Sequence, residues 1–281
     1  MSYVAFFDLE IDPQKKKVLD IGGIRSDEAS FHSTNFIGFR DFIETSDFIC
    51  GHNIFAHDLK YLKQQYGADY LDRIKAIDTL LLSPLLFPKQ PYHHLLKDDK
   101  IQADELNNPL NDAKKARDLF YDEINAFNQL KQELKIVFFN LLGQKPEYSN
   151  FFSFLSYKEY RETNALENLI RELHKDQYCE HADLKSFIQN NPVALAYAIA
   201  LLNCNDRYSI TPPWVLRNHP EVERLIFLLR NNPCLSGCPY CDKALNPNLA
   251  LKRYFGFDAF RQYDDKPFQE HAVNAAIRNK S

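Results

Sequence analysis

The sequence lacks any apolar run long enough to cross a lipid bilayer. A membrane-spanning helix needs about 20 consecutive apolar residues, whereas runs such as Ile136–Phe139 are far shorter. The N-terminal segment carries Asp8 and Glu10 where a secretion signal requires a long apolar stretch. The sequence therefore predicts a soluble intracellular protein, located in the cytoplasm and without contact with a membrane.

The sequence also has no excess of positive charge and few glycines. It contains 34 basic and 38 acidic residues, which give a formal net charge of −4. Any nucleic-acid binding must therefore rest on local patches and on metal ions rather than on an overall basic surface. Only eight glycines are present and no G-x-x-x-x-G-K-[ST] motif occurs, which excludes ATP binding by a phosphate-binding loop of that type.

What the sequence does contain is enough apolar material for more than one folded unit. Its 281 residues, 45% of them hydrophobic, exceed the usual domain size of about 100 to 150. In residues 1–80, short β-rich segments alternate with a helical segment, which is the pattern of a mixed α/β layer fold. The predicted strands lie at 3–11, 18–24, 48–50 and 74–77, and the predicted helix at 55–66.

A long amphipathic helix begins at Pro109 and is expected to close the first domain. Asn108 is suited to cap this helix, and Pro109 fits its first turn. Further amphipathic stretches at 134–142, 165–174, 192–202 and 221–230 predict a second, mostly helical unit. We therefore expect an α/β domain at 1–128, a helical domain at 129–230 and a final segment at 231–281.

Acidic residues that could bind a metal occur in three places. On a strand, Asp8 and Glu10 point to the same face, about 6.6 to 7 Å apart, within reach of one hard cation. Asp58 lies on the largely apolar face of a helix that Asn53 is expected to cap, and Asp112 lies in the first turn of the long helix. Each has an ordinary alternative, namely a wet strand face, a surface acid, or a carboxylate favoured by the helix dipole. Only their combination indicates a site.

These three segments, in this order, resemble the three motifs of the DnaQ-like DEDD exonuclease superfamily. Phe7-Asp8-Leu9-Glu10 resembles the first motif, the segment from Gly51 to Leu59 the second, and the segment from Pro109 to Ala113 the third. The segment from Ile77 to Leu80 matches a strand common between the second and third motifs. The resemblance covers roughly the first 125 residues.

The resemblance implies a ribonuclease-H-like sheet and a 3′-to-5′ exonuclease activity with two divalent ions, Mg²⁺ or Mn²⁺. The catalytic, metal-binding carboxylates would be those of Asp8, Glu10, Asp58 and Asp112. Leu9 and Asn53 would contact the nucleic acid. This chemistry is physically sensible, because two cations about 3.5 to 4 Å apart stabilise both the attacking and the leaving oxygen of an in-line displacement at phosphorus.

One feature of the family pattern is absent. The His subclass has histidine five residues before the last Asp and the Tyr subclass has tyrosine four before it, but Asn107 and Asn108 occupy these positions here. Neither asparagine can act as a general base, a role typically worth about 10² to 10⁴ in rate. His93 or His94 could supply the base, although a structural role is favoured for both. Otherwise the domain would be a slow nuclease or a nucleic-acid-binding module without catalysis.

Three of the six cysteines form a C-x₃-C-x₂-C array. Cys234, Cys238 and Cys241 could bind Zn²⁺ or part of an iron–sulfur cluster, with Cys204 or His219 completing the site. Packed thiols without a metal are the alternative. We expect a structural zinc ion, because the interrupting glycine and proline leave little regular structure in which to bury the cysteines.

The C-terminal part of the chain carries a second resemblance. The aromatic segment 251–257, followed by Phe260, Arg261 and Gln269, resembles the lead-in of RecQ-family helicases. This resemblance implies that DNA, rather than RNA, is the preferred partner of the exonuclease, which would act from a free 3′ end. It also implies a bacterial protein whose helicase region belongs to the same full-length polypeptide.

Overall fold

A computed structural model describes residues 2–12, 14–90, 93, 95, 108–204, 211–232, 234, 237–245, 256, 259–262, 264 and 266–278. The chain divides into two compact units. The first comprises residues 1–160 with a short stretch at 208–212, and the second comprises residues 161–207 and 213–281.

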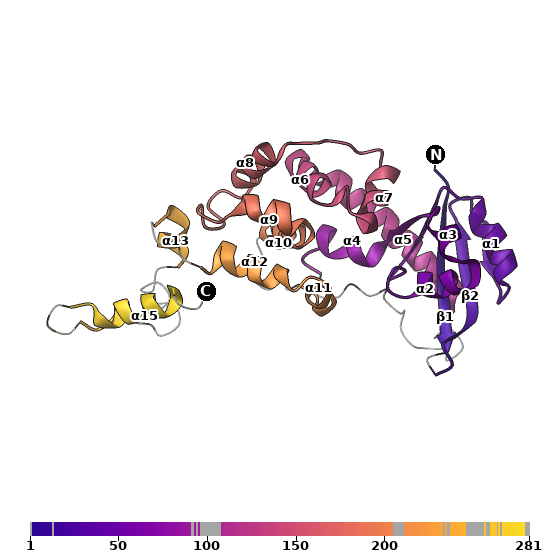
Figure 1. Ribbon diagram of the computed structural model, residues 1–281, viewed down its shortest axis with the longest axis horizontal. Coiled ribbons are helices and arrows are strands. Elements are labelled where there is room, and N and C mark those ends of the chain that lie inside the picture. The colour runs from indigo at the N-terminus through magenta and orange to yellow at the C-terminus, as the bar shows by residue number, and fades with distance from the viewer. Residues whose placement is uncertain are drawn as a thin grey trace. The chain divides into compact units, whose positions relative to one another are not determined.

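The first unit is built on a mixed five-stranded sheet (Figure 1). Its strands are β1 (Val4–Asp12), β2 (Lys17–Arg25), β3 (Ser30–His32), β4 (Phe48–Gly51) and β5 (Lys75–Asp78). They lie in the order β3-β2-β1-β4-β5, with β1 antiparallel to β2, β2 antiparallel to β3, and β1, β4 and β5 parallel. The predicted α/β fold class is therefore confirmed, including every strand that the sequence indicated.

The two faces of β1 pack against different helices. Phe7 and Leu9 are buried in one apolar cluster with Phe39 and Leu62, which belong to α1 (Phe36–Glu44) and α2 (Asp58–Tyr66). On the other face, the ring of Phe6 lies 5.6 Å from that of Phe120, in α5 (Pro109–Gln129). In Figure 1, α1 and α5 accordingly lie on opposite sides of the sheet. Because side chains alternate along a strand, the face toward α5 also carries the acids of β1.

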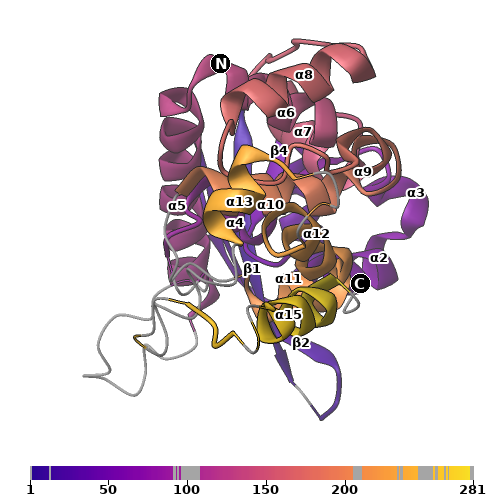
Figure 2. The same cartoon turned by 90° about the vertical axis from the view of Figure 1, so that its left-hand side faces the viewer.

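Helix α5 begins where the sequence predicted. The Asn108 side-chain oxygen accepts hydrogen bonds from the backbone N–H groups of Leu110 and Asn111, and Pro109 occupies the first turn. Asp112 also lies in the first turn. The helix is seen along its length in Figure 2. Because this cap sets where α5 begins, it also sets which residues of the helix face the sheet.

The start of α5 approaches the sheet over a glycine. A Cβ atom placed on Gly22 would lie 2.0 Å from the backbone nitrogen of Leu110 and 2.2 Å from the carbonyl carbon of Pro109. Any larger residue would push the helix away, since both atoms belong to the backbone. Gly22 pairs directly with Asp8 in the sheet. The glycine therefore lets the first turn of α5 lie close to the acids of β1.

The remaining helices of this unit are α3 (Ala68–Leu71), α4 (Thr79–Leu86), α6 (Gln132–Leu142) and α7 (Pro146–Phe154). The Asn150 side chain in α7 donates a hydrogen bond of 3.0 Å to the Ala76 carbonyl in β5. The Phe154 ring packs edge-on against Phe48, with ring centroids 5.5 Å apart. The predicted boundary at residue 128 thus falls inside the first unit. Helical periodicity predicts the helices but not the unit against which they pack.

The second unit is helical, as expected. Its helices are α8 (Thr163–Leu173), α9 (Leu184–Asn190), α10 (Pro192–Cys204), α11 (Pro213–Asn218), α12 (Glu221–Arg230), α13 (Pro239–Ala244) and α15 (Phe268–Arg278). Helix α10 is buried along most of its length, whereas α8 and α12 each bury one apolar face. Among the described helices, none has the length and apolarity that crossing a membrane requires.

Candidate metal centres

Three of the predicted acids converge at the sheet face covered by α5. Asp8 and Glu10 come from β1 and Asp112 from the first turn of α5. One carboxylate oxygen from each lies within 4.8 Å of the others. Oxygen atoms of this kind are the ligands that hard divalent cations prefer. The three acids, which come from distant parts of the sequence, thus form an acidic triad compatible with a metal ion.

The fourth predicted acid lies beside this triad. The side chain of Asp58, at the start of α2, is only 1% exposed. Its Oδ1 accepts a hydrogen bond of 3.0 Å from the Leu9 N–H, the residue between the two acids of β1. Asp58 is also close enough to Asp8 to raise the pKa of that carboxyl. All four residues predicted from the motifs therefore occupy one region of the first unit.

Two of the acids have raised pKa values. Burial raises the pKa of Asp8 to about 8, and the charges of Asp58, Asp112 and Glu10 act in the same direction. Burial also raises the pKa of Asp58, against the hydrogen bonds from His57 and Leu9 that favour its charged form. Grouped carboxylates repel one another unless a proton or a cation neutralises them. The raised pKa values and the repulsion between the carboxylates fit a site that binds divalent cations.

The loop that leads to Asp58 is held by an acid whose role the sequence did not reveal. Asp78, at the end of β5, is 2% exposed. Its Oδ1 accepts from the Asn53 N–H at 2.7 Å and from the Leu80 N–H at 3.0 Å, and its Oδ2 accepts from the Phe55 N–H at 3.1 Å. Burial raises the pKa of Asp78 to about 6, while these hydrogen bonds lower it. One feature of the sequence could have indicated this role of Asp78. The residue ends a strand parallel to β4, and adjacent parallel strands end at the same edge of the sheet.

The predicted helix cap at Asn53 is wrong. Helix α2 begins at Asp58 and the residue before it is His57, which makes no side-chain capping hydrogen bond. Asn53 instead adopts a positive φ of 68° in the preceding turn, a conformation that asparagine tolerates better than most residues. Asn53 is half-buried, and its contact with nucleic acid stays a prediction.

The predicted nucleic-acid contact of Leu9 is not supported. The Leu9 side chain is only 3% exposed and belongs to the apolar cluster beneath the sheet. Alternation along the strand turns this side chain away from the acids. What Leu9 contributes to the site is its backbone N–H, which donates to Asp58.

Asn108, which occupies the base position of the Tyr subclass, and His93, offered as an alternative base, both make other contacts. The Asn108 side chain caps α5. His93 is 6% exposed and its Nδ1 lies 2.8 Å from the Ser83 hydroxyl oxygen, which favours the structural role. His57 lies next to Asp58, with Nδ1 3.6 Å from Asp58 Oδ2, and this contact raises the pKa of His57. Asn107 and His94 lie outside the described residues.

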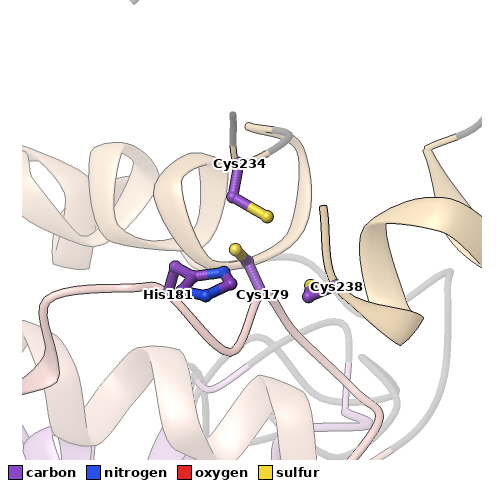
Figure 3. Close-up of side chains that lie close together, drawn as sticks. All are labelled: Cys179, His181, Cys234 and Cys238. Atoms are coloured by element: carbon purple, nitrogen blue, oxygen red, sulfur yellow. The ribbon is translucent and has the colours of Figure 1, made fainter. Parts of the chain in front are cut away.

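A second group of potential ligands lies in the helical unit. Side-chain atoms of Cys179, His181, Cys234 and Cys238 all lie within 4.8 Å of one another. Figure 3 shows that Cys179 and His181 come from one loop, while Cys234 and Cys238 come from a segment much later in the chain. The sulfur atoms of Cys179 and Cys234 point toward each other. The arrangement is compatible with a metal ion held by thiolate and imidazole groups.

The structure corrects the expected fourth ligand of the cysteine array. Cys204 lies at the end of α10, where its Sγ donates a hydrogen bond of 3.1 Å to the Leu201 carbonyl. The ring of His219 lies 5.9 Å from that of Tyr197. Neither belongs to the group around Cys234. Cys179 does belong to it, and Cys241 packs against Cys179 and Cys238. Sequence spacing could not reveal Cys179, because it is brought close only by the packing of the helices.

Most of the helicase-like segment lies outside the described residues, including 251–255 and 257. Gln269 is described and lies in the first turn of α15. The predicted role of this segment therefore stays a prediction.

Known proteins give no further guide to these two centres. The chain matches no known protein family, no curated protein and no solved structure. The functional conclusion rests on the geometry of the residues and on the resemblance of the motifs.

Proposed function

We propose that the first unit is a divalent-metal-dependent 3′-to-5′ exonuclease of the DEDD type, with a ribonuclease-H-like fold. The observation that carries this proposal is the convergence of Asp8, Glu10 and Asp112 within 4.8 Å, with the buried carboxylate of Asp58 beside them. The mixed five-stranded sheet with helices on both faces supports the proposed fold.

In this proposal the four carboxylates would hold two Mg²⁺ or Mn²⁺ ions. When bound, such ions stabilise the charge that develops around phosphorus and lower the pKa of the attacking water. The chain contributes the fixed positions of the acids. Asp58 is oriented by the Leu9 N–H and by the loop that Asp78 holds, while Asp112 is placed by the capped start of α5.

The substrate of the proposed nuclease is DNA with a free 3′ end. Support for DNA over RNA comes from the resemblance of the C-terminal segment to a DNA helicase, which we propose is part of the same full-length polypeptide. Because the Asn108 side chain is engaged in capping α5, we expect the reaction to proceed without a base at this position. The rate should then lie below that of relatives with such a base, by up to about 10² to 10⁴.

A second candidate function is nucleic-acid binding without cleavage. The observation that favours it is the pair of asparagines at positions 107 and 108, where the family places its base. In this case the domain would hold DNA for an attached helicase. The metal ions would then serve to bind phosphate groups rather than to activate water.

Digestion of labelled nucleic acid separates the two functions. Single-stranded and duplex DNA and RNA, labelled at the 3′ or the 5′ end, would be incubated with Mg²⁺, Mn²⁺ or EDTA. The nuclease proposal predicts immediate release of the 3′ label as mononucleotide and progressive shortening of 5′-labelled DNA, both abolished by EDTA. Retarded migration of DNA in a gel without any shortening, at high protein concentration and long times, would favour the binding function.

A further inference from the structure

The loop that carries Cys179 and His181 is fixed by its neighbours. The Cys179 N–H donates a hydrogen bond of 2.8 Å to the Leu229 carbonyl at the end of α12. On the other side, the Arg171 guanidinium donates to the carbonyls of Glu180 at 2.7 Å and Ala182 at 3.0 Å. These contacts hold the loop on both sides of His181. The thiol and the imidazole are therefore presented by an ordered loop.

The segment after α12 is held against the same place. Cys238 is the residue before α13, and its sulfur accepts a hydrogen bond of 3.5 Å from the Cys241 N–H. The Tyr240 hydroxyl donates to the Arg230 carbonyl at 2.9 Å. A backbone N–H directed at a cysteine sulfur favours its ionised form, and metals bind the thiolate. Cys238 and Cys241 are both 5% exposed, so their sulfurs are shielded from solvent.

We propose that Cys179, Cys234 and Cys238, with His181 as the fourth ligand, bind one structural zinc ion that fastens the α8–α9 loop to the segment after α12. A tetrahedral site with Zn–S distances of about 2.3 Å separates its ligand atoms by about 3.8 Å. The four ligand atoms lie within 4.8 Å of one another, so small rotations of the side chains close the site. An iron–sulfur cluster places iron and sulfide between the thiolates, for which this spacing is too narrow.

Cys241 lies just behind the four ligands. It packs against Cys179 and Cys238 and donates its N–H to the Cys238 sulfur. In the proposed site it supports a ligand rather than binding the metal. His181 is exposed, whereas Cys241 is buried. In the proposed site the imidazole would therefore lie on the solvent side of the zinc.

The test is the zinc content of the purified full chain and of two matched variants. We expect about one zinc per chain in the wild type, most of it lost in Cys179→Ser. Cys204→Ser changes another buried cysteine of the same unit, outside the group, and should keep its zinc. Full zinc content in Cys179→Ser, or a zinc-free wild type that takes up neither Zn²⁺ nor Co²⁺, would overturn the proposal. An iron-containing brown protein would overturn it as well.

A measurement on the wild type covers the case in which Cys179→Ser fails to fold. After replacement of zinc by Co²⁺, the visible absorption distinguishes three thiolates and one imidazole from four thiolates. Alkylation followed by mass spectrometry should show Cys179, Cys234 and Cys238 protected until a chelator is added. Modification of Cys179 at equal rates with and without chelator would contradict the site. A four-thiolate spectrum, kept in His181→Ala and lost in Cys241→Ser, would overturn His181 as ligand. The site does not depend on nuclease activity, so the two proposals fail separately.

Discussion

At the scale of single residues, Asp8 couples the candidate metal centre to stability. Burial and the neighbouring acids raise its pKa to about 8 in the folded protein, whereas an unperturbed Asp has a pKa of about 3.9. Between these values the folded, metal-free protein holds a proton that the unfolded chain has released. The stabilising contribution is therefore complete at low pH and is lost as the pH rises toward about 8.

The variant Asp8→Asn tests this linkage, because asparagine keeps the shape but does not titrate. In EDTA, we expect the wild type to lose stability relative to the variant as the pH rises from 5 to 8, by at most about 1.4 kcal/mol per pH unit. Mg²⁺ should raise the melting temperature of the wild type at pH 8 but not that of the variant. Scanning calorimetry at several pH values measures both effects. Parallel pH profiles for the two proteins would contradict the account.

The sequence predicted that Asp8, Glu10 and Asp112 lie together, but it predicted the cysteine group only in part. Asp8 and Glu10 follow from the two-residue period of a strand, and Asp112 from a helix start that Asn108 and Pro109 marked. Each signal is local. Cys179 has no local signal, since it reaches Cys234 only through the packing of α8 to α12. The same limit explains why Cys204 was chosen in its place.

At the scale of elements, Asp78 joins the end of β5 to the loop after β4. The variant Asp78→Ala removes three hydrogen bonds to backbone N–H groups, one buried and two partly buried. A buried N–H left without a partner costs about 1 to 3 kcal/mol. We expect lower stability in urea unfolding and slower cleavage, because the loop that positions Asp58 loosens. Asp78→Asn keeps one acceptor oxygen and should lose less of both. Equal effects of the two variants would show that the charge matters rather than the hydrogen bonds.

Gly22 sets the distance between β2 and the start of α5. In Gly22→Ala, the new methyl group would meet the backbone of Pro109 and Leu110, so the first turn must move and carry Asp112 with it. We expect Mn²⁺ binding to weaken by about tenfold or more, equivalent to about 1.4 kcal/mol, in a protein that still folds. Isothermal titration with Mn²⁺ measures this.

The control is Gly23→Ala, on the same strand. Its methyl group would meet the side chain of Phe42 at 2.9 Å, and a ring can move where a helix backbone cannot. This variant should lose some stability and keep its Mn²⁺ affinity. Comparable loss of affinity in both variants would mean that destabilisation, rather than displacement of α5, weakens the site.

Four of the five strands and several of the helices followed from hydrophobic period and capping residues, but two features of the arrangement did not. The turn at Asn53 depends on Asp78, which is distant in sequence, so local capping rules misplaced the start of α2. Helix α7 has no local signal for its partner, yet its Asn150 and Phe154 contact the sheet. Local patterns give helices and strands, whereas the partner of each apolar face depends on the whole unit.

At the scale of the whole molecule, the two proposed metal centres belong to different units and use different ligand atoms. Hard cations prefer the oxygens of the first and zinc accepts the sulfurs of the second. We therefore expect that loss of the metal from one centre leaves the other centre intact. Cys179→Ser should lose zinc but retain Mg²⁺-dependent cleavage per folded molecule, and Asp8→Ala should lose cleavage but retain zinc. Elemental analysis and cleavage assays on the same preparations check this, and loss of both properties in either variant would contradict it.

The central claim is that the four converging carboxylates of the first unit hold the cations that drive cleavage. The most direct test is the rate of nucleotide release from 3′-labelled DNA, as a function of Mn²⁺ concentration, for the wild type, Asp8→Ala and Asp122→Ala. Asp122 is an exposed acid of α5 outside the triad. The account predicts a Mn²⁺-dependent rate in the wild type and in Asp122→Ala, and no release by Asp8→Ala at any Mn²⁺ concentration while it remains folded. Undiminished release by Asp8→Ala would contradict it.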